Sequence, residues 1–140
     1  MTATAVEIDG RTRRLARSLV EFLETGTPPD GLYSPDVFCD LTTPHWRQQA
    51  EGVDGVVGLR RSSHPGPSTV VRTRLDQTGS GFVLEFEERY EAQGGQWYAR
   101  QLVRADIGDE GITQLSVYCT GDWDEARQAL HRREVSLLRP

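Results

Sequence analysis

Two alternating segments joined by a glycine-rich turn decide the fold; they occupy residues 81–107, GFVLEFEERYEAQGGQWYARQLVRADI. In the first segment apolar side chains recur at every second position, with one exception. A period of two is the pattern of a β-strand, whose successive side chains face opposite sides of a sheet. The second segment has the same period and places Trp97, Ala99, Gln101 and Val103 on one face. Since the turn between them contains Gly94 and Gly95, the pair predicts a β-hairpin.

The same pattern continues outward on both sides of this hairpin. Segments rich in Val, Ile, Phe, Tyr and Trp are separated by short turns that contain glycine, serine or aspartate. Strands are therefore predicted over residues 68–76, 81–92, 96–107 and 111–120, which together form a four-stranded antiparallel meander.

The first half of the chain has a helical period instead. Leu15, Leu19, Phe22 and Leu23 predict a helix that begins near residue 12 and ends at Gly26. A second helix is predicted over residues 53–61, where the residues at helical spacing are Val53, Val56, Val57 and Arg60.

The segments between and after these helices have shorter signals. Ser34 and Pro35 predict the cap and first position of one helical turn. A short strand is predicted over residues 37–41, and a loop or the entry to a turn over residues 44–47. After the meander, Asp122 is predicted to cap a last helix, with His131, Arg132 and Arg133 in its final turn.

The order of these elements predicts an α+β domain. Helices that precede a strand meander usually cover one face of a twisted sheet. The length of 140 residues suits one domain. Residues 1–11 are predicted to be a flexible lead-in, and residues 12–140 a single domain.

Composition narrows the classes of function. The formal net charge is -5, and all 16 basic residues are arginine, so a lysine Schiff base is excluded. Without a dense basic stripe, neither nucleic acid nor a membrane surface is expected as partner. The chain also has no long apolar run and no signal-peptide pattern at its start, which predicts a cytoplasmic protein. The spacing of Cys39, Cys119 and the three histidines matches no metal motif, and no cofactor is expected.

Glu88 is the exception to the alternation in residues 81–92. It occupies the apolar register, between Phe86 and Tyr90. One interpretation places it beyond the core, solvated or paired with an arginine. The other is a buried carboxyl whose pKa is raised by desolvation, which would suit a general acid or base.

Asp40 is a second carboxylate within an apolar segment, and His45 and Trp46 follow it closely. Its side chain either caps the following turn or lies at the wall of a cavity. His45 is either a loop residue or a participant in proton transfer.

The element order, together with residues 40–47 (DLTTPHWR), 81–85 (GFVLE) and 109–115 (DEGITQL), resembles the nuclear transport factor 2-like superfamily. This superfamily includes the ketosteroid isomerases and the SnoaL-like polyketide cyclases. The resemblance implies a cone-shaped, curved antiparallel sheet with N-terminal helices packed on it, an apolar pocket between them, and a homodimer. It also implies a pocket carboxylate that transfers protons, at a position that corresponds best to Asp40.

The chain departs from two enzyme groups of that superfamily. Its first helix has no tyrosine to act as the oxyanion donor of a ketosteroid isomerase, and the chain has no asparagine of the kind that limonene epoxide hydrolases use. Steroid isomerisation is therefore not expected.

The leading hypothesis is a cofactor-free acid/base isomerase, cyclase or dehydratase of bacterial secondary metabolism that acts on a small, apolar, carbonyl-bearing molecule. Asp40 would be the base, with Glu88 or His45 as the acid. Six aromatic residues would bind the substrate: Phe38, Trp46, Phe86, Tyr90, Trp97 and Tyr118. The alternatives are a noncatalytic ligand-binding or dimeric scaffold protein, and an epoxide hydrolase-like enzyme.

Overall fold

A computed structural model describes residues 7–139, which form one curved six-stranded sheet and three helices. The helices are α1 (Gly10–Thr25), α2 (Gly52–Ser63) and α3 (Glu125–Glu134). The strands are β1 (Tyr33–Thr43), β2 (Trp46–Glu51), β3 (Ser68–Gln77), β4 (Gly81–Ala92), β5 (Gly95–Gly108) and β6 (Gly111–Trp123). The α+β class predicted from the sequence is confirmed.

The strands lie in the order β2-β1-β6-β5-β4-β3. The predicted meander is confirmed as β3 to β6, each strand antiparallel to the next. The sheet as a whole is mixed, because β1 pairs with β6 in parallel while β2 pairs with β1 in antiparallel. A parallel neighbour requires a long crossover, and in the sequence β2, α2 and the strands β3 to β5 lie between β1 and β6.

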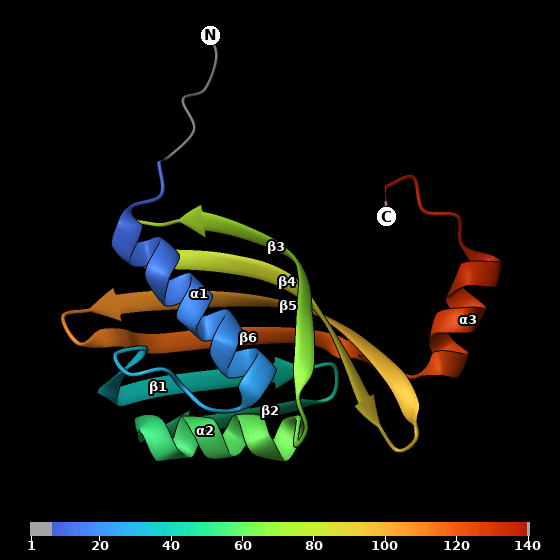
Figure 1. The fold of residues 1–140 in the computed structure, drawn as a ribbon, viewed down its shortest axis with the longest axis horizontal. Helices are drawn as coiled ribbons and strands as arrows, with labels where there is room; N and C mark the ends of the chain where they lie inside the picture. Colours follow the sequence, from blue (N-terminus) through green and yellow to red (C-terminus); the bar gives the residue numbers. More distant parts are fainter. Residues whose placement is uncertain (1–6, 140) are drawn as a thin grey trace, which may run out of the picture.

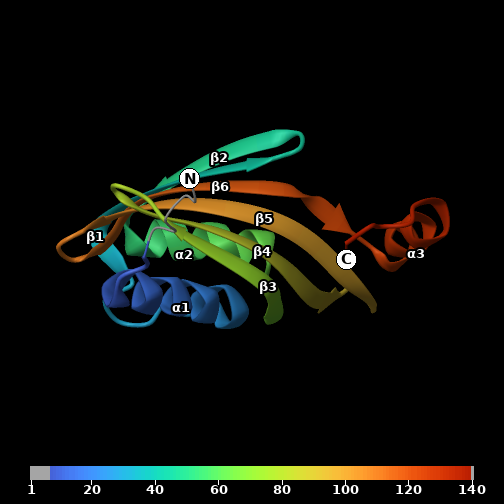
Figure 2. The same cartoon turned by 90° about the horizontal axis from the view of Figure 1, so that it is seen from above.

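The sheet curves around α1 and α2, which both lie on its concave face (Figures 1 and 2). α3 lies beyond one end of the sheet, where its main contacts are with β5 and β6. The core fills the space between the two helices and the concave face, where the apolar side of each alternating strand is buried. Its largest fully buried apolar side chains are Phe82, Phe86, Leu32, Leu84 and Ile112.

The first helix begins two residues earlier than predicted. The Asp9 carboxylate accepts a hydrogen bond from the Thr12 amide at 2.7 Å, which caps the helix at residue 9. Gly26 ends it with a φ of +77°, a conformation that glycine adopts without strain. The predicted lead-in over residues 1–11 falls mostly on residues 1–6, which lie outside the described part of the chain.

The helical turn predicted at Ser34 and Pro35 is wrong. Both residues belong to β1, which is extended from Tyr33 onward. The pairing of β1 with β6 shifts register between Tyr33 and Phe38, and this irregular stretch accommodates a proline that has no N–H to donate.

The loop or turn entry predicted over residues 44–47 is correct for its first two residues only. Pro44 and His45 form a tight turn, but β2 begins at Trp46 and returns antiparallel to β1. The segment WRQQAE of β2 is mostly exposed on both faces, so it has no apolar alternation to reveal it as a strand. At the other end of the chain, the cap of α3 is Asp124 and not Asp122, which belongs to β6; His131, Arg132 and Arg133 do lie in the last turn as predicted.

No helix between residues 7 and 139 has the length and apolar character needed to cross a membrane.

Candidate functional site

Glu88 is fully buried on the concave face of β4, at 0% side-chain exposure, and forms an ion pair with Arg60 of α2. Two guanidinium nitrogens of Arg60 donate to the two carboxylate oxygens, one of them at 3.2 Å. Gln101 of β5 donates its side-chain amide to one oxygen, and the Ser68 hydroxyl of β3 lies 2.9 Å from the other. Four donors therefore surround the Glu88 carboxylate, and they occupy both of its oxygens.

Arg60 also links this network to the end of the first helix. Its guanidinium donates to the carbonyl oxygen of Leu23 at 2.7 Å, in the last turn of α1. A cation is favourable there, because the last carbonyls of a helix carry a partial negative charge. The Glu88 network thus joins both concave-face helices to three strands, which makes it a structural centre of the domain.

A cavity of about 60 Å³ lies beside this network, between α1, α2 and the concave face of the sheet. A cavity needs roughly 10–15 Å³ to hold one water molecule, so this one has room for about five groups of that size. Its walls are mainly apolar and include Leu19, Phe22, Leu59, Val103, Leu115 and Val117. Arg60 and Gln101, both ligands of Glu88, also line it.

Tyr33 and Cys39 add two further polar groups to the cavity wall. Burial raises the pKa of the Tyr33 phenol above its usual range, and burial followed by the charge of Asp40 raises the pKa of the Cys39 thiol to about 11. Both groups are therefore neutral at physiological pH. No hydrogen bond contributes to this shift for Tyr33, and within residues 7–139 the fully buried side-chain atom without a partner is Nδ1 of His64. The cavity thus offers hydrogen-bond donors, while its nearest carboxylate is already saturated.

Of the sequence-predicted site residues, four lie together on the concave face. Phe86 and Tyr90 share the face of Glu88 on β4, and Trp97 of the neighbouring strand β5 lies directly opposite Tyr90. The rings of Tyr90 and Trp97 stack at 6.3 Å between centroids, and His64 contacts Tyr90 edge-on at 4.9 Å. This aromatic group continues the concave face past Glu88, outside the walls of the 60 Å³ cavity.

Asp40 lies on the opposite, convex face of the sheet. The strand pairings show this: Asp40 of β1 lies beside Ser116 of β6, Ser116 lies beside Arg104 of β5, and Arg104 lies beside Val83 of β4. Residues side by side across strands share a face, and Val83 is an odd number of residues from Glu88 on β4, so its side chain is on the opposite face. Arg47 of β2 donates to the Asp40 carboxylate at 2.9 Å, and this hydrogen bond, helped by one from Gln49, lowers the Asp40 pKa.

The remaining predicted residues also lie away from the cavity. Phe38 and Tyr118 share the convex face with Asp40, and Tyr118 is 53% exposed. His45 is exposed in the turn between β1 and β2, and Trp46 beside it is 69% exposed. The structure therefore does not bring Asp40, His45 and Glu88 into one enclosed site.

None of the residues that line the cavity was among the predicted site residues, and the three donors missed are Tyr33, Arg60 and Gln101. Signals for two of them exist in the sequence. Arg60 occupies an apolar position of its helical pattern, and Gln101 occupies an apolar position of its strand, so each is a polar side chain directed into the core. Tyr33 has no such signal, because it lies two residues before Pro35 in a segment with no clear period. Within residues 7–139 there is no group of three or more side chains suited to hold a metal ion.

Comparison with known proteins is informative for the fold alone. No protein-family model and no curated protein matches the chain. Among solved structures, a nuclear transport factor 2-like protein from Anabaena variabilis superposes with a TM-score of 0.68 at 15% identity, over 86% of this chain and 97% of that one.

Two other solved structures have names that suggest enzymes. A proposed polyketide cyclase from Xanthomonas campestris gives a TM-score of 0.60 at 15% identity, over 77% of this chain and 89% of that one. A proposed ketosteroid isomerase from Kribbella flavida gives 0.57 at 15% identity, over 93% and 91%. The chain has the fold of the nuclear transport factor 2-like superfamily.

Proposed function

We propose that the protein binds a small, mainly apolar molecule with a carbonyl or another hydrogen-bond acceptor in the cavity beneath α1 and α2. The observation that carries this proposal is the polarity of the wall. The lining is apolar except for a few polar side chains, and Tyr33, Arg60 and Gln101 among them are donors. An apolar cavity with a few placed polar groups is the usual form of a small-molecule site.

The size of the cavity limits the ligand. Sites for drug-sized molecules usually enclose about 300–1,000 Å³. A cavity of about 60 Å³ suits a ketone or aldehyde of about five non-hydrogen atoms, unless the side chains around it move. A steroid or a polyketide ring system is several times larger than this.

The Tyr33 hydroxyl is the donor that we expect to contact the carbonyl. No hydrogen bond from a described residue contributes to its pKa, and the raised pKa keeps the proton on the oxygen. By contrast, the Arg60 guanidinium already contacts Glu88 and Leu23.

The test is an NMR titration of the protein with butanone. Butanone should shift the signals of cavity residues in a saturable way, and Tyr33→Phe should weaken binding by about fivefold, the effect of one neutral hydrogen bond. The matched control is Tyr90→Phe, which removes the same hydroxyl from the concave face outside the cavity and should leave the affinity unchanged. Equal effects of the two variants, or no saturable shift, would contradict the proposal.

An acid/base enzyme is the second candidate, and one observation favours it. Glu88 is a fully buried carboxylate whose partners Arg60 and Gln101 form part of the cavity wall. If the pair with Arg60 opened, Glu88 could take a proton from a carbon next to a ligand carbonyl, as in isomerisation, cyclisation or dehydration. Asp40 would not be the base in this mechanism, because it lies on the convex face.

The same titration separates the two candidates when it is run in D₂O. An acid/base site would exchange the protons next to the butanone carbonyl for deuterium, faster than the buffer does. We expect no acceleration from a binding protein. The homodimer and the cytoplasmic location stay predictions, and sedimentation of the purified protein would measure the former.

A further inference from the structure

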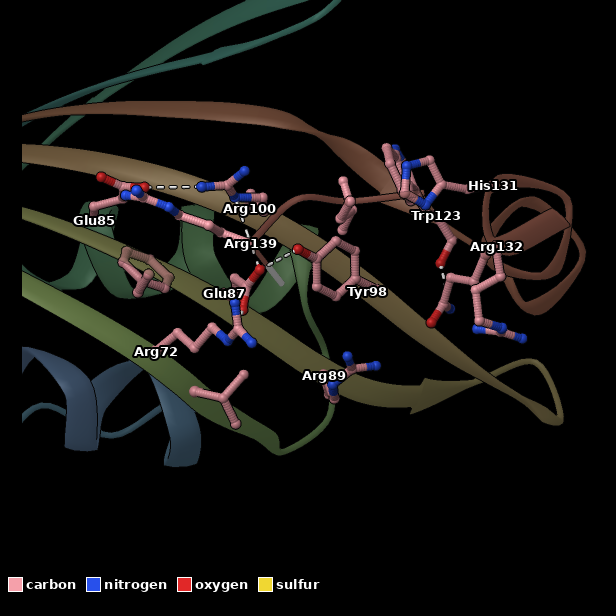
Figure 3. A pocket seen from close by; sticks show the side chains of 14 residues that line it. Arg72, Glu85, Glu87, Arg89, Tyr98, Arg100, Trp123, His131, Arg132 and Arg139 are labelled. Atoms are coloured by element: carbon pink, nitrogen blue, oxygen red, sulfur yellow. Dashed lines mark hydrogen bonds and ion pairs between the residues drawn. The ribbon is translucent and has the colours of Figure 1, made fainter. Parts of the chain in front are cut away.

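A second and much larger hollow lies on the convex face of the sheet, remote from the cavity beneath the helices. It is an open groove of about 760 Å³ between strands β3 to β6 and the residues of α3 and the C-terminal segment (Figure 3). This volume is within the range of small-molecule sites. The function proposed above makes no use of this groove.

The charge of the groove is opposite to that of the protein. Five arginines and two glutamates line it, a formal charge of +3 in a chain whose net charge is -5. The arginines come from separate parts of the fold: Arg72 from β3, Arg89 from β4, Arg100 from β5, Arg132 from α3 and Arg139 from the C-terminal segment. Their convergence is therefore a property of the folded chain and not of a basic run in the sequence.

Only some of these arginines are neutralised within the protein. Arg100 forms an ion pair with Glu85 at 2.9 Å, and Arg72 lies 3.7 Å from Glu87. Arg89, Arg132 and Arg139 form no ion pair with any residue between 7 and 139. In Figure 3, Arg139 lies beside Arg100 and Glu85, whereas Arg132 lies near Trp123 and His131, with Tyr98 between the two.

Aromatic rings lie among the arginines. Tyr98 and Trp123 are 5.6 Å apart between ring centroids, and Trp123 is 5.2 Å from His131 of α3. The guanidinium of Arg89 lies over the Tyr98 ring at 5.1 Å. Such a surface can contact a flat apolar group through its rings and an anion through its guanidinium groups.

We propose that this groove binds the phosphate monoester of a small aromatic molecule. A guanidinium presents a planar fork of N–H donors that matches phosphate oxygens, and a dianionic phosphate compensates more of the +3 charge than a carboxylate does. Arg132, which lies on the same side of the groove as Trp123, holds the phosphate, while Arg139 adds positive charge from the other side and Trp123 contacts the aromatic ring. Neither the cavity nor its proposed ligand takes part in this binding.

Phenyl phosphate is the probe for this proposal. Its binding is followed through the indole N–H signal of Trp123, assigned by Trp123→Phe, and by calorimetry at low and high salt. We expect saturable binding that weakens with salt, because the groove is open to solvent. The double variant Arg132→Gln/Arg139→Gln should weaken it by about tenfold or more, the effect of losing charge-assisted hydrogen bonds.

The same helix offers a matched control. Arg127 and Arg133 also belong to α3 but do not line the groove, so Arg127→Gln/Arg133→Gln removes the same charge without touching the site. This control should bind phenyl phosphate with the wild-type affinity. An equal loss in both double variants would show general attraction to a basic surface and would overturn the proposal.

Two further outcomes would also overturn it. One is inorganic phosphate binding as tightly as phenyl phosphate, which would remove the role of the aromatic rings. The other is the absence of any saturable shift of Trp123, the result expected if a second copy of the chain covers this face. Tighter binding of phenyl phosphate than of inorganic phosphate supports the proposal, provided that only the groove variant weakens it.

Discussion

Replacing Glu88 by glutamine should destabilise the protein strongly. The change keeps the size of the side chain but removes the negative charge that faces Arg60, whose side chain is only 9% exposed. It also turns one acceptor into a donor, which would then face the donors of Arg60 or Gln101. The variant therefore leaves a buried guanidinium without a counter-charge.

The expected magnitude follows from this burial. Removing one partner of a buried ion pair typically costs about 3–5 kcal/mol, a large part of the roughly 5–15 kcal/mol that stabilises a domain. With an unfolding entropy of about 2.1 cal/mol/K per residue, 140 residues give about 0.29 kcal/mol/K. The Tm of Glu88→Gln should thus fall by about 10–17 °C.

Thermal and urea unfolding, followed by circular dichroism, would measure this effect. The matched control is Glu85→Gln on the same strand, which breaks a half-exposed ion pair with Arg100 on the convex face. Exposed pairs contribute about 0–1 kcal/mol, so this Tm should fall by no more than about 3 °C. The double variant Arg60→Leu/Glu88→Leu should lose less unfolding free energy than the two single variants lose together, because it leaves no unpaired charge. Similar Tm values for Glu88→Gln and Glu85→Gln would refute the reasoning.

Three further predictions concern the other ionisable groups. Asp40→Asn should leave butanone binding unchanged, because Asp40 lies on the face of the sheet opposite the cavity; a changed affinity would contradict this. Carboxyl NMR should place the Asp40 pKa below 3.8. At pH 8 a thiol reagent should modify Cys119 slowly and Cys39 only on unfolding, since burial raises both pKa values, that of Cys39 to about 11; fast modification of Cys39 would contradict its burial. Burial, followed by Arg60, lowers the pKa of His64, so the unfolded chain binds its proton more readily. Its contribution to stability should be complete above pH 6.5 and be lost as the pH falls below it, and a His64→Gln variant with the same acid-side slope in its unfolding free energy would argue against this role.

The meander and the first helix could be predicted because their sequence periods persist over many residues. β4 and β5 alternate over 12 and 14 residues, and nothing in their sequence favours another structure. β2 had no such signal, because a strand exposed on both faces has no reason to alternate. The start of β1 was hidden by Pro35, whose usual place in a turn is overridden here by pairing with a distant strand.

The candidate site was only partly accessible from the sequence. Glu88 could be found because a charged residue in an apolar register is conspicuous, and both interpretations of it were partly correct: it is paired with an arginine and it is also buried. Asp40 is also a carboxylate within an apolar segment, but it is not buried in the core. Its strand lies near the edge of the sheet, where the convex face is open to solvent, so a carboxylate between apolar residues there needs no cavity. Which face a residue occupies depends on the pairing of β1 with β6, which no local pattern contains.

The parallel pairing of β1 with β6 has a consequence for how the chain folds during synthesis. Cys39 pairs with Leu115, 76 positions later, and β1 joins the rest of the sheet only through β6. On the ribosome, the β1–β2 hairpin and α2 therefore emerge long before the last strand that they need. Until β6 is made, the apolar side of β1 lacks its sheet neighbour, and contacts between such distant segments form slowly. Nascent chains that end before β6 should be the ones that chaperones bind most readily.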